Sequence, residues 1–183
     1  MAIWAQDFYE IQEALEENDP LQQRVLELVI EEPIHGKAIE GDGRTDSLRD
    51  ILNQFFEGQI SLEEAISKVS SELPRHESPH SHSNRVFADG WDERLLRTQA
   101  SRFYNQAVLE LLSERGDNSC FVPHSSQEDR DSPCTIQLAG KEADIDILLN
   151  RLNRTYGEAD YHDEVKIPNH PHCTHTVVPT SES

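Results

Sequence analysis

Residues 92–115 read DERLLRTQASRFYNQAVLELLSER, and this stretch decides the fold of the second half of the chain. Its apolar side chains recur every three to four residues and form one broad stripe, which is the pattern of an amphipathic helix. Asp92 and Glu93 suit the beginning of such a helix, and Arg115 followed by Gly116 suits its end. The sequence therefore predicts a helix of about 24 residues, roughly 36 Å long, as the spine of this half.

Residues 1–73 predict an acidic module of short helices. Asn18 precedes Asp19-Pro20, a cap followed by a proline at the start of a helix over residues 21–30. A further helix ends at Gly58, and Ser61 with Glu64 forms a capping box that begins the next one. This region holds 17 acidic and 5 basic residues, a composition typical of a solvated element that docks proteins.

Residues 74–90 predict a linker rich in histidine, serine and proline. Its sequence shows no helical or strand periodicity. His76, His80 and His82 would bind a metal weakly if they lie on a flexible segment, so we expect a mobile, pH-responsive loop.

Residues 91–183 predict the long helix packed with a small sheet. Short strands are expected at residues 120–122, 135–138, 164–167 and 174–178, with another helix over 142–156. The fold class is therefore α+β and mainly helical. The acidic helical part comes first, and the long helix with its β-rich C-terminal subdomain follows.

The charge of the chain restricts its partners. The 183 residues carry a formal net charge of −19, from 35 acidic and 16 basic residues. Binding to nucleic acid or to anionic membranes rests on lysine and arginine, so neither is expected as a direct partner. The N-terminus lacks the pattern of a signal peptide, and no stretch approaches the roughly 18 apolar residues of a membrane span. We therefore expect synthesis in the cytoplasm.

Residues 166–179, KIPNHPHCTHTVVP, hold the clearest candidate for chemistry. His170, Cys173 and His175 lie within six residues, and a tetrahedral Zn²⁺ site uses four such ligands. Cys134 is the natural distant ligand, with His172 or Cys120 as substitutes. A site with four protein ligands would be structural, since a catalytic zinc keeps a position open. In the alternative interpretation, Cys173 is a buried thiol and the histidines are polar surface groups.

Other candidate sites carry weaker signals. Cys120 and His124 form a local Cys/His pair, but no nucleophile elbow supports it. The acidic residues at 128–131 and at 144 and 146 lack the spacing of a calcium loop and are interpreted as solvated turns and helix-start charges. No catalysis is expected.

Three segments, in this order, resemble the C-terminal domain of the phage Mu F-like minor head proteins, also called head morphogenesis proteins. The first segment is residues 96–105, LRTQASRFYN, and the second runs from Asp129-Arg130-Asp131-Ser132-Pro133-Cys134 to Leu138-Ala139-Gly140-Lys141. The third is residues 170–179, HPHCTHTVVP. The similarity covers about residues 60–180. Cys134 stands one position early, and His175 replaces a cysteine of the family, an exchange that keeps a zinc ligand.

This resemblance implies a structural minor capsid protein of a tailed phage or prophage. Such a virion protein lies inside the head near the portal and acts in assembly or in DNA packaging and ejection, after its synthesis in the host cytoplasm. Its implied partners are the portal protein and the major capsid protein, and homo-oligomerisation stays open. The implied metal ligands are Cys134, His170, Cys173 and His175, around a structural Zn²⁺.

Two other functions remain open from the sequence. One is a zinc-stapled acidic adaptor or inhibitor in the cytoplasm that binds a basic protein. The other is a small metal-dependent hydrolase that uses His170, His172 or His175 around an open zinc site.

Overall fold

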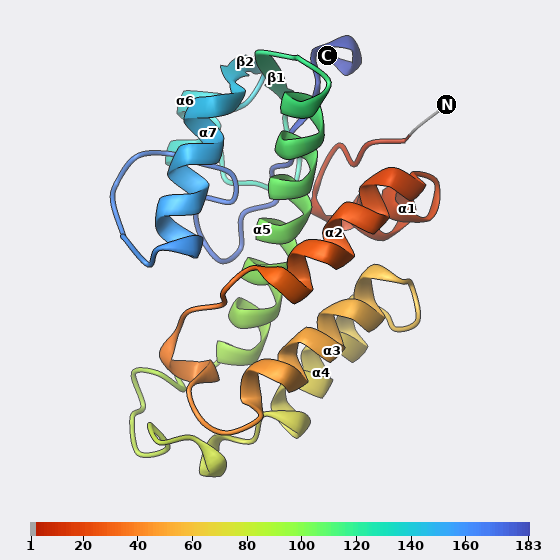
Figure 1. The fold of residues 1–183 in the computed structure, drawn as a ribbon. Helices are drawn as coiled ribbons and strands as arrows, with labels where there is room; N and C mark the ends of the chain where they lie inside the picture. The colour runs from red at the N-terminus through yellow and green to blue at the C-terminus, as the bar shows by residue number, and fades with distance from the viewer. Residues whose placement is uncertain (1–2) are drawn as a thin grey trace.

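The long helix α5 (Trp91–Glu114) runs through the centre of the molecule, as Figure 1 shows for the computed structural model, which describes residues 3–183. Every residue from 99 to 109 is buried, including polar ones. The helix therefore contacts neighbours on all sides instead of presenting one face to solvent. The predicted helix over residues 92–115 is confirmed.

The helices of the first 73 residues pack against one another and against α5. They are a 3₁₀ turn (Phe8–Glu10), α1 (Ile11–Glu16), α2 (Asp19–Glu31), a 3₁₀ turn (Lys37–Ile39), α3 (Arg44–Phe56) and α4 (Leu62–Glu72). The Asn18 side chain accepts a hydrogen bond from the Leu21 N–H, and Ser61 and Glu64 form the predicted capping box. These side chains satisfy backbone donors that a helix start leaves free, which is why both helices begin there.

Residues 74–90 are packed against the N-terminal helices. The buried Arg44 guanidinium donates to the backbone carbonyls of Ala38, Leu73 and Pro74. A 3₁₀ turn (Arg75–Glu77) follows, and the Phe87 ring is buried with the Arg75 guanidinium 5.5 Å from its centroid. The Arg44 hydrogen bond to the Pro74 carbonyl and the buried Phe87 ring thus hold this segment in place.

A three-stranded antiparallel sheet closes one end of α5. It contains β1 (Ser119–Val122), β2 (Lys141–Asp144) and β3 (Val178–Pro179), in the order β2-β1-β3. Cys120 pairs with Ala143 on one side and with Pro179 on the other. The chain therefore returns to the sheet at its C-terminal end (Figure 1).

Several predicted elements of this half were wrong. Residues 135–138 belong to the helix α6 (Pro133–Leu138), because Pro133 begins a helix after Ser132. Residues 164–167 form no strand, and of residues 174–178 only Val178 enters the sheet. The reason for the latter is that two backbone N–H groups there bond to side chains, Thr174 to Glu128 and Val177 to Asn105.

The helix predicted over residues 142–156 is shorter. Residues 141–144 pair with β1, and the Asp144 carboxylate then accepts from the Ile147 N–H to begin α7 (Ile145–Leu152). A π-helical turn (Asn153–Gly157) continues it, and a 3₁₀ turn (Thr180–Glu182) ends the chain.

The expected fold class, α+β and mainly helical, is confirmed. Within residues 3–183, none of the helices has both the length and the apolar character that crossing a bilayer requires.

Candidate metal centre

Two cysteines that are far apart in the sequence lie close together, one in α6 and the other near the C-terminus. Cys134 lies in the first turn of α6, and Cys173 lies in the extended segment that leads to β3. Both are buried, and the Cys173 Sγ lies 3.9 Å from the Cys134 Sγ. That separation is too long for a disulfide, and both thiols are free. It is compatible with two sulfurs that share one metal ion.

His170 and Glu128 complete a group of four close ligand atoms. One atom from each of Glu128, Cys134, His170 and Cys173 lies within 4.8 Å of the other three. The His170 Nε2 is 3.1 Å from a Glu128 carboxylate oxygen. The group is therefore close enough to hold a metal ion.

His175 lies beside this group and is completely buried. Its Nδ1 is 3.9 Å from the Cys173 Sγ and 3.9 Å from the Glu128 Oε2. Its Nε2 has no hydrogen-bond partner within residues 3–183. Burying an imidazole with so little hydrogen bonding costs free energy, a cost that a metal bound to one of its nitrogens would offset.

Hydrogen bonds from Thr174, in the segment that carries His170 and Cys173, hold the Glu128 side chain in place. Its Oε2 accepts from the Thr174 backbone N–H at 2.8 Å and from the Thr174 hydroxyl at 3.2 Å. The side chain is only 5% exposed. The interpretation of residues 128–131 as a solvated acidic turn was therefore wrong for Glu128, although Asp129 and Asp131 are exposed.

The pKa values of the Cys134 and Cys173 thiols are shifted in opposite directions. The hydrogen bond from Cys173 lowers the pKa of the Cys134 thiol, and the same contact together with burial raises the pKa of Cys173. The pKa of His170 is raised, first by its hydrogen bond with Cys134 and also by the Glu128 charge. These shifts favour a thiolate at Cys134 near the Glu128 carboxylate, and a divalent cation bound there would neutralise both charges.

The donor set fits zinc better than a hard cation. Two sulfurs and one imidazole are soft or borderline ligands, typical of Zn²⁺, while Ca²⁺ and Mg²⁺ take oxygen ligands. Cys134, His170 and Cys173 would supply three ligands. His175 or the Glu128 carboxylate would supply the fourth.

The structure brings three of the predicted ligands, Cys134, His170 and Cys173, into one group with Glu128, and it places the fourth, His175, beside that group. The two substitutes lie elsewhere. His172 is half exposed and its Nδ1 is 4.0 Å from Glu93, while the Cys120 thiol donates to the Ala143 carbonyl. Sequence reasoning missed Glu128 because nothing in its local pattern separates it from the neighbouring acidic residues.

The Cys120 and His124 pair is not suited to nucleophilic catalysis. Cys120 is buried in β1, and burial raises the pKa of its thiol to about 12. A thiolate is the reactive form, so this cysteine stays protonated and inert at neutral pH.

The long helix is hydrogen-bonded to the segment that carries His170 and Cys173. The Asn105 Oδ1 accepts from the Val177 N–H at 3.0 Å, and the Arg97 guanidinium donates to the His172 carbonyl at 3.3 Å. Asn105 is fully buried, and its amide nitrogen also donates to Ser101. Residues from α5, from the turn before α6 and from the C-terminal segment therefore form one connected polar network.

Comparisons of the chain with protein-family models, with curated proteins and with solved structures found no match.

Proposed function

We propose that this protein is a structural minor head protein of a tailed phage or prophage, with a C-terminal part that is stapled by a structural Zn²⁺. The observation that carries the proposal is the group formed by Cys134, His170, Cys173 and Glu128, with His175 beside it. These five side chains are enough to fill all four positions of a structural zinc with protein ligands.

The three sequence segments that carry the family resemblance also contact one another. Asn105 and Arg97 of the first segment bond to the third, and Cys134 of the second lies against Cys173 of the third. Segments that form one site in the folded protein are expected to occur together in the sequences of a family that has this site. This convergence supports the resemblance as a shared structural unit and not as three unrelated short matches.

The charge of the chain supports a role based on protein contacts. With a net charge of −19, the body would be repelled by packaged DNA and held by a portal or major capsid protein. In this function the zinc fixes the C-terminal segment against α5, so that a small domain stays folded during assembly. No catalytic step is part of the proposal.

Mass spectrometry of particles tests the location. Nuclease-treated, gradient-purified particles from a lysate that makes this chain should contain it at a few copies per particle, together with portal protein. Its recovery only in the particle-free fraction would contradict the head function. The acidic residues of the N-terminal helices would then favour the second candidate, an adaptor that binds a basic protein.

The zinc content is tested separately on the purified protein. Native mass spectrometry and elemental analysis should give one Zn²⁺ per chain, lost in a Cys134→Ser variant and kept in a Cys120→Ser variant. Cys120 is the matched control because it is an equally buried thiol outside the group. Protein that binds no zinc after expression in zinc-supplemented medium would contradict the stapled site.

A further inference from the structure

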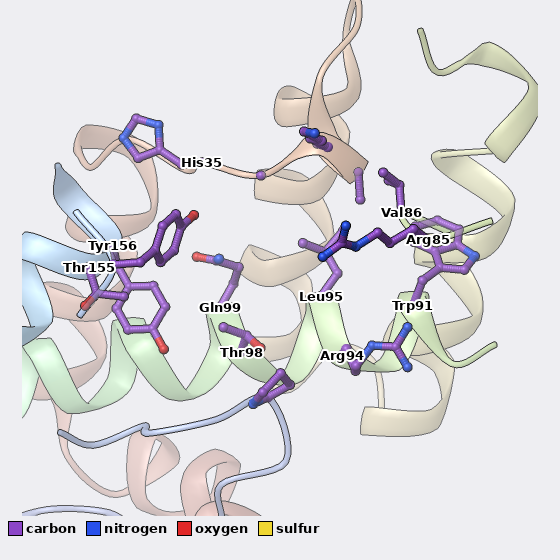
Figure 2. Close-up of a pocket in the computed structure, with 15 residues that line it drawn as sticks. His35, Arg85, Val86, Trp91, Arg94, Leu95, Thr98, Gln99, Thr155 and Tyr156 are labelled. Carbon is purple, nitrogen blue, oxygen red and sulfur yellow. The ribbon is translucent and has the colours of Figure 1, made fainter. Parts of the chain in front are cut away.

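A cavity of ≈ 360 Å³ lies beside the first turns of α5. Figure 2 shows its walls, which come from the loop after α2, the end of the 74–90 segment, the first turns of α5 and the segment after α7. Pro171, from the segment that carries His170 and Cys173, also lines it. Its volume falls in the range of small-molecule sites in proteins, roughly 300–1,000 Å³. It is therefore large enough for a ligand of the size of a mononucleotide.

The charged residues of this cavity are all cationic. Lys37, Arg85 and Arg94 line it, and no lining residue is acidic. The lining is thus cationic although the chain as a whole is acidic, with 35 acidic and 16 basic residues. Within residues 3–183, none of the three has a carboxylate oxygen within 4.0 Å. The cavity thus offers positive charge that the described chain does not neutralise.

The nearby carboxylates of α5 are engaged elsewhere. Asp92 accepts a hydrogen bond from the Ser70 hydroxyl, and Glu93 pairs with Arg97. Arg94 donates to the carbonyls of Ala88 and Asp89, contacts that fix its position and leave its charge uncompensated. An anion is therefore the complementary ligand for this end of the cavity.

The other lining residues include apolar and aromatic side chains together with a few polar ones. Trp91, Leu95 and Tyr156 line the cavity, and Figure 2 shows Arg85 and Arg94 near Trp91, with Gln99 and Tyr156 toward the opposite end. The Trp91 ring is held edge-to-face on Phe87 at 4.9 Å between centroids. Gln99, 5% exposed, has one side-chain hydrogen bond within residues 3–183, which its Oε1 accepts from Arg102. Its amide is available to a polar edge of a ring.

We propose that this cavity binds a small organic anion that joins a flat ring to a phosphate or carboxylate group. The anionic group would lie at the Arg85 and Arg94 end, with Lys37 adding charge, and the ring would pack on Leu95 and Tyr156 with its polar edge at Gln99. Aromatic walls favour flat rings because the faces stack. This inference does not rest on the proposed head function or on zinc binding, although the lining residue Pro171 directly follows His170 in the chain.

Calorimetric titration with two probes, adenosine 5′-monophosphate and 2-naphthoate, tests the proposal on the full chain. We expect at least one to bind at a ratio of one to one with a sub-millimolar Kd and to shift the NMR signal of the Trp91 indole. Adenosine, which lacks the anion, and inorganic phosphate, which lacks the ring, should each bind at least about tenfold more weakly. Binding by neither probe, or equal binding of the ring compounds with and without the anion, would overturn it.

Variants locate the site. The double variant Lys37→Ala, Arg85→Ala removes two exposed cations and should weaken binding about tenfold, while Thr98→Phe should block the cavity. The matched control, Lys68→Ala with Arg130→Ala, removes the same charge outside the cavity and should bind as the wild type does. An equal loss in the control would mean nonspecific attraction and would overturn the site. Melting curves of all variants establish that they are folded.

Discussion

Replacing Cys173 by serine gives the sharpest test of the metal centre. The thiol is 1% exposed and lies 3.9 Å from both the Cys134 sulfur and the His175 Nδ1. Serine is nearly isosteric, so the packing changes little, but a neutral hydroxyl is a poor zinc ligand. The variant should therefore lose zinc with little change in the shape of the core.

The expected loss of stability follows from the linkage between metal binding and folding. A metal that binds only the folded state stabilises it by about 2.7 kcal/mol at 100 times its Kd and about 4.1 kcal/mol at 1,000 times. For a domain of this length, each kcal/mol shifts the melting temperature by about 2–4 °C. Cys173→Ser should thus lower the melting temperature of the zinc-loaded protein by roughly 5–15 °C.

Four melting curves separate the metal effect from packing. Wild type and Cys173→Ser are each melted with added zinc and after removal of metal by a chelator. We expect the two proteins to differ widely with zinc and to agree within about 1 kcal/mol without metal. Cys120→Ser serves as the control, because its chelator response should equal that of the wild type. If zinc-supplemented wild type and Cys173→Ser melt at the same temperature, the reasoning is refuted.

Three further predictions concern buried polar side chains. Asn105→Ala leaves the buried Val177 N–H unpaired and should cost about 1–3 kcal/mol in urea unfolding; a smaller loss than in an exposed Asn150→Ala control would contradict this. Arg44→Ala removes a donor to three backbone carbonyls and should cost about 2–3 kcal/mol, with faster proteolytic cleavage within residues 74–90; unchanged cleavage would count against that contact. Burial raises the pKa of Tyr104, so the folded state keeps the phenol proton that the unfolded state loses near pH 10. The free energy of unfolding therefore falls as the pH rises above 10, with a slope that approaches about 1.4 kcal/mol per pH unit. Tyr104→Phe should remove this share of the slope between pH 10 and 11, and an unchanged slope would argue against it.

The sequence by itself determined the elements whose signals are local. Local sequence patterns predicted the helix α5, the cap at Asn18 and the capping box at Ser61. Periodicity and capping depend on residues within one or two helical turns of each other. The candidate ligands Cys134, His170, Cys173 and His175 were also readable, since few residue types bind zinc and three of them lie together. The family resemblance placed Cys134 with them.

Tertiary structure alone decided how the C-terminal half is arranged. Residues 174–177 have a β-branched composition, yet their N–H groups at 174 and 177 bond to Glu128 and Asn105 instead of to a strand. The burial of Glu128 and the cationic cavity beside α5 likewise depend on segments that are 40 or more residues apart. Such contacts leave no local pattern in the sequence. They form only after the chain has packed, when a group distant in the sequence satisfies a backbone hydrogen-bonding group or lies beside a charge.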